Sequence, residues 1–93
     1  MTTPRFLWDE EKEADNVRKH GVDFREAIEA LLDPLARSEE DVEHSDVEQR
    51  WRTIGTSRRG RVLSVTTRED GSTIRIISAR AATRRERHAY EEA

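Results

Sequence analysis

Apolar residues recur at helical spacing in one segment of the chain, and this segment gives the clearest secondary-structure signal. They fall at positions i, i+3, i+4, i+7 and i+8 and are Phe24, Ala27, Ile28, Leu31 and Leu32. This spacing predicts a helix with one continuous core-facing stripe. Asp23 and Glu26 form a capping-box-like pair at its start, and Pro34 ends it because proline cannot continue a helix.

The segment before this helix predicts an edge strand followed by a more polar helix. Residues 6–8 are a short apolar run, and Asp9 directly after them is a good N-cap. Residues 10–19 are mostly charged and carry few apolar positions, so this helix buries only a narrow stripe. Gly21 is a natural residue at the helix C-terminus, because glycine adopts the left-handed conformation that often ends helices.

The second half of the chain alternates between polar and apolar residues, as strands do. Residues 51–55, 61–67 and 73–79 predict three strands, and the short glycine-containing turns between them predict hairpins. The sheet is therefore expected to be largely an antiparallel meander. Residues 35–38 predict a further strand before it, whereas the acidic stretch 39–48 predicts a loop.

Thr83 and Glu86 form a second capping box, which predicts a last helix ending near Glu92. The expected order is β-α-α-β-β-β-β-α, an α+β fold. Residues 1–93 are expected to form a single domain, because the chain is short and shows no linker or repeat. Two N-terminal helices and one C-terminal helix are expected to pack on the sheet.

Strand alternation separates the side chains of the sheet into two faces. The residues expected beneath the helices are Trp51, Leu63, Val65, Ile74 and Ile76. The residues expected on the other face are Arg52, Ser64, Thr66 and Arg75. Arg80 lies at the end of the last strand, where a bulge could turn it to either side.

The two halves of the chain carry opposite charge. Residues 1–49 hold 15 Asp and Glu against 6 Lys and Arg, whereas residues 50–88 hold 11 Arg, no Lys and 3 acids. Guanidinium groups bind phosphate in a bidentate way, so the basic half predicts contact with a polyanion, of which nucleic acid is the commonest. Only 33% of residues are hydrophobic and 40% are charged, so the core is thin and a partner is expected to complete it.

Composition also excludes several classes of protein. There is no cysteine, which excludes disulfides and thiolate chemistry. No signal pattern or long apolar run occurs, so a cytoplasmic protein without membrane association is expected. Asp41, Glu43, His44 and Asp46 match no known metal-ligand spacing, so this stretch is expected to be a solvated loop. Neither a metal nor another cofactor is expected.

Several motifs in order give the chain a resemblance to the BrnT toxin family over residues 6–92. They include WDEEK at 8–12, Asn16, RKHGV at 18–22, Phe24, DPL at 33–35, residues 50–55, RIISAR at 75–80, residues 82–83 and 86–87, and Tyr90. The resemblance implies a type II toxin–antitoxin ribonuclease that inhibits translation, with a fold like the RelE and ParE toxins. It also implies a partner, a ribbon-helix-helix antitoxin of the BrnA type. In the toxin–antitoxin complex, only the antitoxin is expected to contact operator DNA.

RNA cleavage by the substrate's own 2′-hydroxyl needs no protein nucleophile, but it does need proton transfer and stabilisation of a phosphorane. Arg75 and Arg80 are the candidate phosphate ligands, and His20 is the candidate general acid or base. The candidate RNA-binding residues are Lys12, Asn16, Arg52, Arg84 and Tyr90, with Glu86 as a lesser candidate for proton transfer.

Plain structural roles compete with each of these assignments. His20 could only cap its helix, Arg75 and Arg80 could pair with acids of the N-terminal half, and Glu86 fits a capping residue. Two other functions also stay open: a catalytically inactive binding module, and a topoisomerase poison of the ParE kind.

Overall fold

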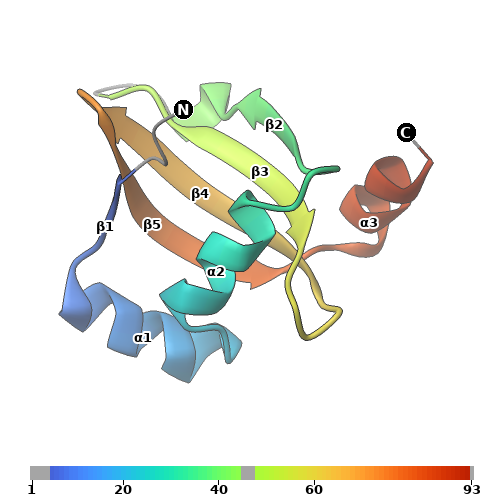
Figure 1. Cartoon of the computed structure of the whole chain (residues 1–93), viewed down its shortest axis with the longest axis horizontal. Helices are drawn as coiled ribbons and strands as arrows, with labels where there is room; N and C mark the ends of the chain where they lie inside the picture. Colours follow the sequence, from blue (N-terminus) through green and yellow to red (C-terminus); the bar gives the residue numbers. More distant parts are fainter. Residues whose placement is uncertain (1–4, 45–47, 93) are drawn as a thin grey trace.

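The computed structural model describes residues 5–44 and 48–92, which form three helices, a short 3₁₀ helix and five strands (Figure 1). The elements in chain order are β1 (Arg5–Leu7), α1 (Glu10–His20), α2 (Phe24–Leu31), β2 (Arg37–Glu40), η1 (Val42–His44), β3 (Trp51–Thr56), β4 (Val62–Asp70), β5 (Thr73–Ala81) and α3 (Arg84–Glu91). The expected α+β class and order of elements are confirmed. No helix in these described ranges is both long and apolar enough to cross a membrane.

Local capping chemistry explains where α1 begins and ends. The Asp9 carboxylate accepts hydrogen bonds from the backbone N–H groups of Glu11 and Lys12, at 2.8 and 3.2 Å. Gly21 ends the helix with a φ of +68°, a conformation that glycine adopts without strain. Acidic residues occupy the first turn and basic residues the last, which complements the helix dipole.

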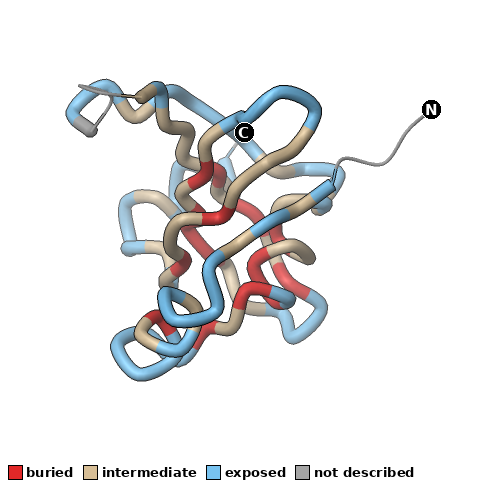
Figure 2. The backbone as a smooth tube through the Cα atoms, turned by 90° about the vertical axis from the view of Figure 1, so that its left-hand side faces the viewer, coloured by how far each residue is buried: buried red, intermediate tan, exposed pale blue. Residues whose placement is uncertain are grey.

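The core lies between α2 and the centre of the sheet, and Figure 2 shows its buried residues gathered in the middle of the molecule. Its members are Val22, Phe24, Ala27, Ala30, Leu63, Val65, Ile76 and Ala79, all at most 1% exposed. The expected stripe of α2 therefore packs on β4 and β5 through Phe24, Ala27, Ile28 and Leu31. Gly55 allows this close approach, because a Cβ there would lie 2.1 Å from the backbone oxygen of Ala30. Leu32, the last residue of the expected stripe, caps the helix and is 54% exposed, so the prediction is wrong for this residue.

The strands lie in the order β1-β5-β4-β3-β2. Strands β2 to β5 form the predicted antiparallel meander, but β1 pairs with β5 in parallel, so the sheet is mixed. The expectation of an antiparallel meander is therefore wrong for β1. Only three residues of β1 pair, Arg5 to Leu7, and the intervening helices and strands give the chain the long connection that parallel pairing requires.

Several boundaries differ from the sequence prediction. The expected loop over residues 39–48 is wrong in its first half, because Glu39 and Glu40 belong to β2 and residues 42–44 form η1. Strand β2 begins two residues later than expected, because Asp33 holds the preceding turn by accepting hydrogen bonds from the backbone N–H groups of Leu35 and Ala36. Strand β4 continues to Asp70, three residues beyond the prediction, so only Gly71 and Ser72 separate it from β5, which begins at Thr73 as predicted and continues to Ala81. Gly71 has a φ of +65°, which permits this tight connection.

A β-bulge in β5 decides which residues of this strand point away from α1 and α2. Thr67 pairs with Ile76 and Thr66 pairs with Ser78, so Ile77 is an extra residue. Even-numbered positions face the core before the bulge, as Ile76 does, whereas Ala79 faces it afterwards. Arg75 and Arg80 therefore point to the same side of the sheet although five positions separate them.

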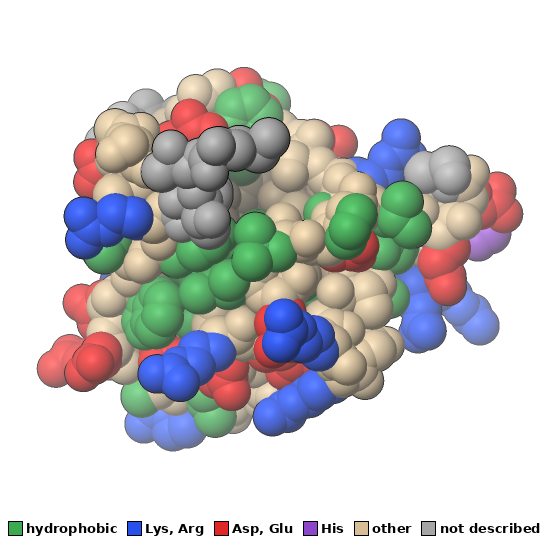
Figure 3. Space-filling view, viewed as in Figure 1, with side chains coloured by type: hydrophobic (Ala, Val, Ile, Leu, Met, Phe, Trp, Pro, Cys, Tyr) green, Lys and Arg blue, Asp and Glu red, His purple; other side chains and the backbone are tan. Residues whose placement is uncertain are grey.

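The helices cover only part of their face of the sheet. Beside α2, a groove of about 310 Å³ is lined largely by apolar side chains, including Phe6, Leu31, Leu32, Trp51 and Ile74. Figure 3 shows hydrophobic side chains exposed on this side of the molecule. Trp51 and Ile74, expected beneath the helices, are therefore only half-buried.

Candidate functional site

The side of the sheet opposite α1 and α2 carries a concentration of arginines, and we call it the arginine face. Residues that pair across strands point to the same side, so the register arranges this face in rows. The rows are Arg68–Arg75, then Glu39–Arg52–Thr66–Ser78, then Arg37–Ile54–Ser64–Arg80. Adjacent rows lie about 7 Å apart, because two strand residues separate them. The two predicted phosphate ligands, Arg75 and Arg80, thus stand in the two outer rows.

Arg75 lies in a pocket of about 140 Å³ that is rich in cations. Its lining comprises Asp9, Lys12, Glu48, Arg50, Arg68, Arg75, Ile76 and Ile77. Four basic side chains thus outnumber two acidic ones. The start of α1 supplies Lys12, so the structure brings this predicted RNA-binding residue to Arg75. We call this hollow the Arg75 pocket.

The guanidinium of Arg75 differs from its neighbours in its contacts. Glu48 forms ion pairs with Arg68 and, at 3.3 Å, with Arg50. Within the described part of the chain, Arg75 has no carboxylate partner, and its Nε is buried without a hydrogen bond. A guanidinium placed in this way retains its hydrogen-bonding capacity for an anionic ligand.

Glu48 is held in its charged form by the arginines around it. Hydrogen bonding from Arg68 lowers the pKa of Glu48, and Arg50 adds to this effect, whereas partial burial opposes it. The carboxylate therefore orients two guanidinium groups without cancelling the positive charge of the Arg75 pocket.

The second cluster centres on Glu86 at the first turn of α3. Its two carboxylate oxygens accept hydrogen bonds from Arg80 at 2.8 and 3.1 Å, and Arg52 lies 3.7 Å away. Arg52 also forms an ion pair with Asp41 at 3.3 Å. Hydrogen bonding from Arg80 lowers the pKa of Glu86 to about 2 against the effect of burial, with help from the backbone and side chain of Thr83. The same contact raises the pKa of Arg80.

None of the described residues of helix α3 is buried, so the helix has no apolar core contact of its own. Polar contacts at two points attach it to the rest of the protein. Glu86 closes the capping box with Thr83 and binds Arg80 near the start of the helix. Near its end, the Tyr90 hydroxyl donates to Asp33 and lies 3.0 Å from the Thr56 hydroxyl. These two contacts stand one helical turn apart and hold α3 against the end of β3.

The second attachment point shifts the pKa of both partners. Burial alone would raise the pKa of Asp33, but hydrogen bonds from Tyr90 and from the N–H groups of Leu35 and Thr56 outweigh it and lower the pKa. The hydrogen bond to Asp33 raises the pKa of Tyr90. Tyr90 therefore remains protonated at neutral pH and continues to donate to Asp33.

Asn16 has a structural role instead of the expected contact with RNA. It is only 5% exposed, and its side-chain nitrogen donates to the backbone oxygens of Val22 and Ala79, both at 2.8 Å. Its side-chain oxygen accepts from the Ala79 N–H at 3.1 Å. The side-chain amide thus pairs with the backbone of β5 at Ala79, beyond the residues that β1 pairs with, and its nitrogen and oxygen are both used within the protein.

His20 and Arg84 stand apart from both arginine clusters. Both are exposed, and neither lines a pocket that contains Arg75 or Arg80. Their assigned roles therefore stay predictions. In the described part of the chain, no group of three or more His, Cys, Asp and Glu side chains is placed to hold a metal ion.

Sequence reasoning missed Glu48, Arg50 and Arg68. Arg68 was assigned to a hairpin turn, but β4 continues to Asp70 and places it opposite Arg75. Extending the alternation of β4 by one more residue pair would have found it. Glu48 lies outside any strand, so no periodic signal could have placed it between two arginines.

Comparison with known proteins agrees with the motifs seen in the sequence. Residues 8–86 match the family described as the ribonuclease toxin BrnT of type II toxin–antitoxin systems. The crystal structure of the Brucella abortus ribonuclease toxin BrnT is similar, with a TM-score of 0.69 and 28% identity over 88% of this chain and 100% of that one. No curated protein matches the sequence. The chain therefore belongs to the BrnT family of ribonuclease toxins of type II toxin–antitoxin systems.

Proposed function

We propose that this BrnT-type toxin is an active, metal-independent endoribonuclease whose substrate lies across the arginine face. Membership of the family implies an RNA substrate and an antitoxin partner. The observation that carries the proposal is the guanidinium of Arg75, which has no carboxylate partner among residues 5–44 and 48–92 and shares its pocket with three other cations. Charge-assisted contacts of this kind bind phosphate strongly and in a defined orientation.

The reaction requires little from the protein beyond positioning and charge. The 2′-oxygen of one nucleotide attacks the adjacent phosphorus, a P–O bond forms, and the bond to the 5′-oxygen of the next nucleotide breaks. The products are a 2′,3′-cyclic phosphate and a 5′-hydroxyl, with one proton removed from the attacking oxygen and one delivered to the leaving oxygen. The phosphorane carries extra negative charge, which Arg75 would stabilise.

The remaining assignments follow from position on this face. Lys12 would bind a phosphate beside Arg75, and Arg52 and Arg80, fixed by Glu86, would bind a flanking one. We keep His20 as the proposed general acid or base, and Arg84 and Tyr90 as proposed RNA contacts.

Cleavage of a fluorescent RNA in EDTA tests this function. We expect wild-type protein to cleave, and both Arg75→Ala and Arg80→Ala to lose roughly 100-fold or more in rate, the usual effect of removing one oxyanion donor. Arg25→Ala is the matched control, because this exposed arginine lies on α2, on the other side of the sheet. Equal rates in all three variants would contradict the proposed site.

Two outcomes would indicate a different function. Wild-type protein that binds RNA without cleaving it would indicate a binding module, and gyrase inhibition without RNA cleavage would indicate a topoisomerase poison. Circular dichroism would verify that each variant is folded, so that a lost activity is not a lost structure.

We further propose that the toxin acts in the cytoplasm by inhibiting translation, and that a ribbon-helix-helix antitoxin of the BrnA type neutralises it. The RelE/ParE-like fold is part of the same proposal. The antitoxin, and not the toxin, would contact operator DNA, consistent with the negative net charge of −3 on this chain. Mobility-shift assays test this: we expect operator binding by the complex and none by the toxin alone.

A further inference from the structure

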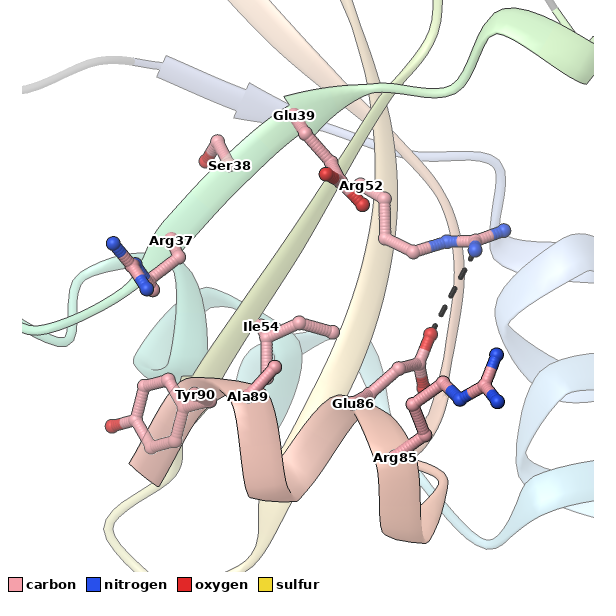
Figure 4. A pocket seen from close by; sticks show the side chains of 9 residues that line it. All are labelled: Arg37, Ser38, Glu39, Arg52, Ile54, Arg85, Glu86, Ala89 and Tyr90. Atoms are coloured by element: carbon pink, nitrogen blue, oxygen red, sulfur yellow. Dashed lines mark ion pairs between the residues drawn. The ribbon is translucent and has the colours of Figure 1, made fainter. Parts of the chain in front are cut away.

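A cavity of about 480 Å³ opens on the arginine face between α3 and strands β2 and β3 (Figure 4). Its lining is Arg37, Ser38, Glu39, Arg52, Ile54, Arg85, Glu86, Ala89 and Tyr90. Such a volume is within the usual range for small-ligand sites and can hold a nucleobase with its ribose. We call it the α3 cavity.

The α3 cavity combines an apolar surface with planar cations. Ile54 and Ala89 supply aliphatic surface from the sheet and from the helix, and the ring of Tyr90 stands at one end (Figure 4). Arg37 and Arg85 are exposed at the rim and have no ion pair within the described residues. A base can lie on aliphatic surface while a guanidinium plane stacks on it, which is how single-stranded RNA bases are commonly bound.

Glu39 supplies the α3 cavity with a carboxylate besides that of Glu86. It shares a row with Arg52, and in Figure 4 the two side chains lie near each other on the same side of the strands. Unlike Glu86, Glu39 has no hydrogen-bond or ion-pair partner among the described residues. An ionised carboxylate only accepts hydrogen bonds, so it selects an edge that donates.

Guanine fits this requirement best among the four bases. Its N1–H and N2–H₂ groups are adjacent donors that match the two oxygens of one carboxylate, whereas adenine and cytosine offer a single amino group and uracil a single imide N–H. Arg52 lines the cavity, Arg80 is bonded to Glu86 in its wall, and the two would hold the attached phosphate.

We propose that the α3 cavity is a guanine-binding subsite read by Glu39, so that RNA is bound with a guanosine next to the Arg52–Arg80 cluster. This subsite rests on the proposed ribonuclease function. It also makes α3 part of the substrate site, since the contacts of Glu86 and Tyr90 hold the cavity's helical wall in place.

Nucleotide titrations followed by amide NMR test the subsite directly. We expect GMP to shift the amide resonances of Ile54 and Ala89 and to bind at least about fivefold tighter than AMP, CMP or UMP, the low end of the effect of a bidentate base contact. IMP, which lacks the N2 amino group, should bind more weakly than GMP. Glu39→Gln should remove the preference.

Glu40→Gln is the matched control, because Glu40 follows on the same strand, points to the other side of the sheet and bonds Gln49. Retention of the GMP preference in Glu39→Gln, or equal binding of all four nucleotides by wild-type protein, would overturn the subsite.

The base preference of wild-type protein and of Glu39→Gln is then measured with tetranucleotide RNAs that differ at one base. Wild-type protein should bind the guanosine-containing RNA at least about fivefold tighter, and Glu39→Gln should lose this preference. Tight binding and cleavage without base preference would overturn the subsite and leave the ribonuclease function intact. Selective GMP binding by a protein that never cleaves RNA would contradict the ribonuclease function instead.

Discussion

The contact between Glu86 and Arg80 gives the sharpest prediction on stability. Glu86→Gln keeps the size of the side chain and an oxygen for the Thr83 N–H, but it removes the charge that Arg80 and Arg52 bind. In the folded protein the pKa of Glu86 falls from its ordinary 4.5 to about 2. At about 1.4 kcal/mol per tenfold change in proton affinity, this corresponds to roughly 3 kcal/mol.

Solvent reduces this figure, because the side chains of Glu86 and Arg80 are 18% and 33% exposed. We therefore expect Glu86→Gln to lower the free energy of unfolding by about 1–3 kcal/mol at pH 7. Urea unfolding followed by tryptophan fluorescence measures this loss. The control Glu91→Gln removes an exposed ion pair with Arg87 in the same helix and should change stability by less than about 0.5 kcal/mol.

The pH dependence provides a second check with a defined sign. A carboxylate whose pKa is lower in the folded state stabilises the protein above its unfolded pKa, and the effect is lost as the pH falls toward the folded pKa. The stability difference between wild type and Glu86→Gln should therefore be full above about pH 5 and shrink between pH 4.5 and about pH 2. Equal losses for Glu86→Gln and Glu91→Gln, or a gap that stays constant down to pH 3, would refute the reasoning.

Three further substitutions test other contacts. Asn16→Ala should lower the unfolding free energy by about 2–3 kcal/mol in urea titrations, because the edge of β5 at Ala79 loses its buried partner; wild-type stability would contradict the structural role. Gly55→Ala should cost about 3 kcal/mol or more, or prevent folding, because the new Cβ meets the Ala30 backbone, and a thermal melt would show it. Tyr90→Phe should speed hydrogen exchange across α3 while the amides of the core strands keep their protection, because it loses the hydroxyl that fastens the end of the helix; unchanged exchange in α3 would show that this hydroxyl is dispensable.

The elements with strong local signals were predictable, and the contacts between distant segments were not. Asp9 and Gly21 set the two ends of α1, because capping depends on neighbouring residues alone. The stripe of α2 packs on the sheet as its spacing predicts up to Leu31, whereas Leu32 is exposed. The direction of β1 was missed, because three residues carry no information about which strand they join. Asn16 shows the same limit: from the sequence it lies on a polar stripe, yet Ala79, 63 positions away, determines its role.

The arginine face was predictable only in part from the sequence. Strand alternation placed Arg75 on this face, but it left the side of Arg80 open, and only the bulge in β5 brings the two to the same side. Glu48 could not be identified, since it gains its position from two arginines on other segments. His20 was chosen for its chemistry alone, and it is exposed and lines neither the Arg75 pocket nor the α3 cavity.

The single inserted residue in β5 has a consequence for reading related sequences. If Ile77 were deleted, the two arginines would be four positions apart on a strand with regular alternation and would still point to the same side. The pairing of β4 with β5 would then continue without the register shift between Thr66 and Thr67. In a relative that has one residue more or fewer between these arginines and keeps the bulge, one of the two guanidinium groups would point into the apolar layer under α2. Burying that charge without a partner would strongly destabilise the fold. The number of residues between them is therefore a simple marker of whether a relative can still place both guanidinium groups on the arginine face.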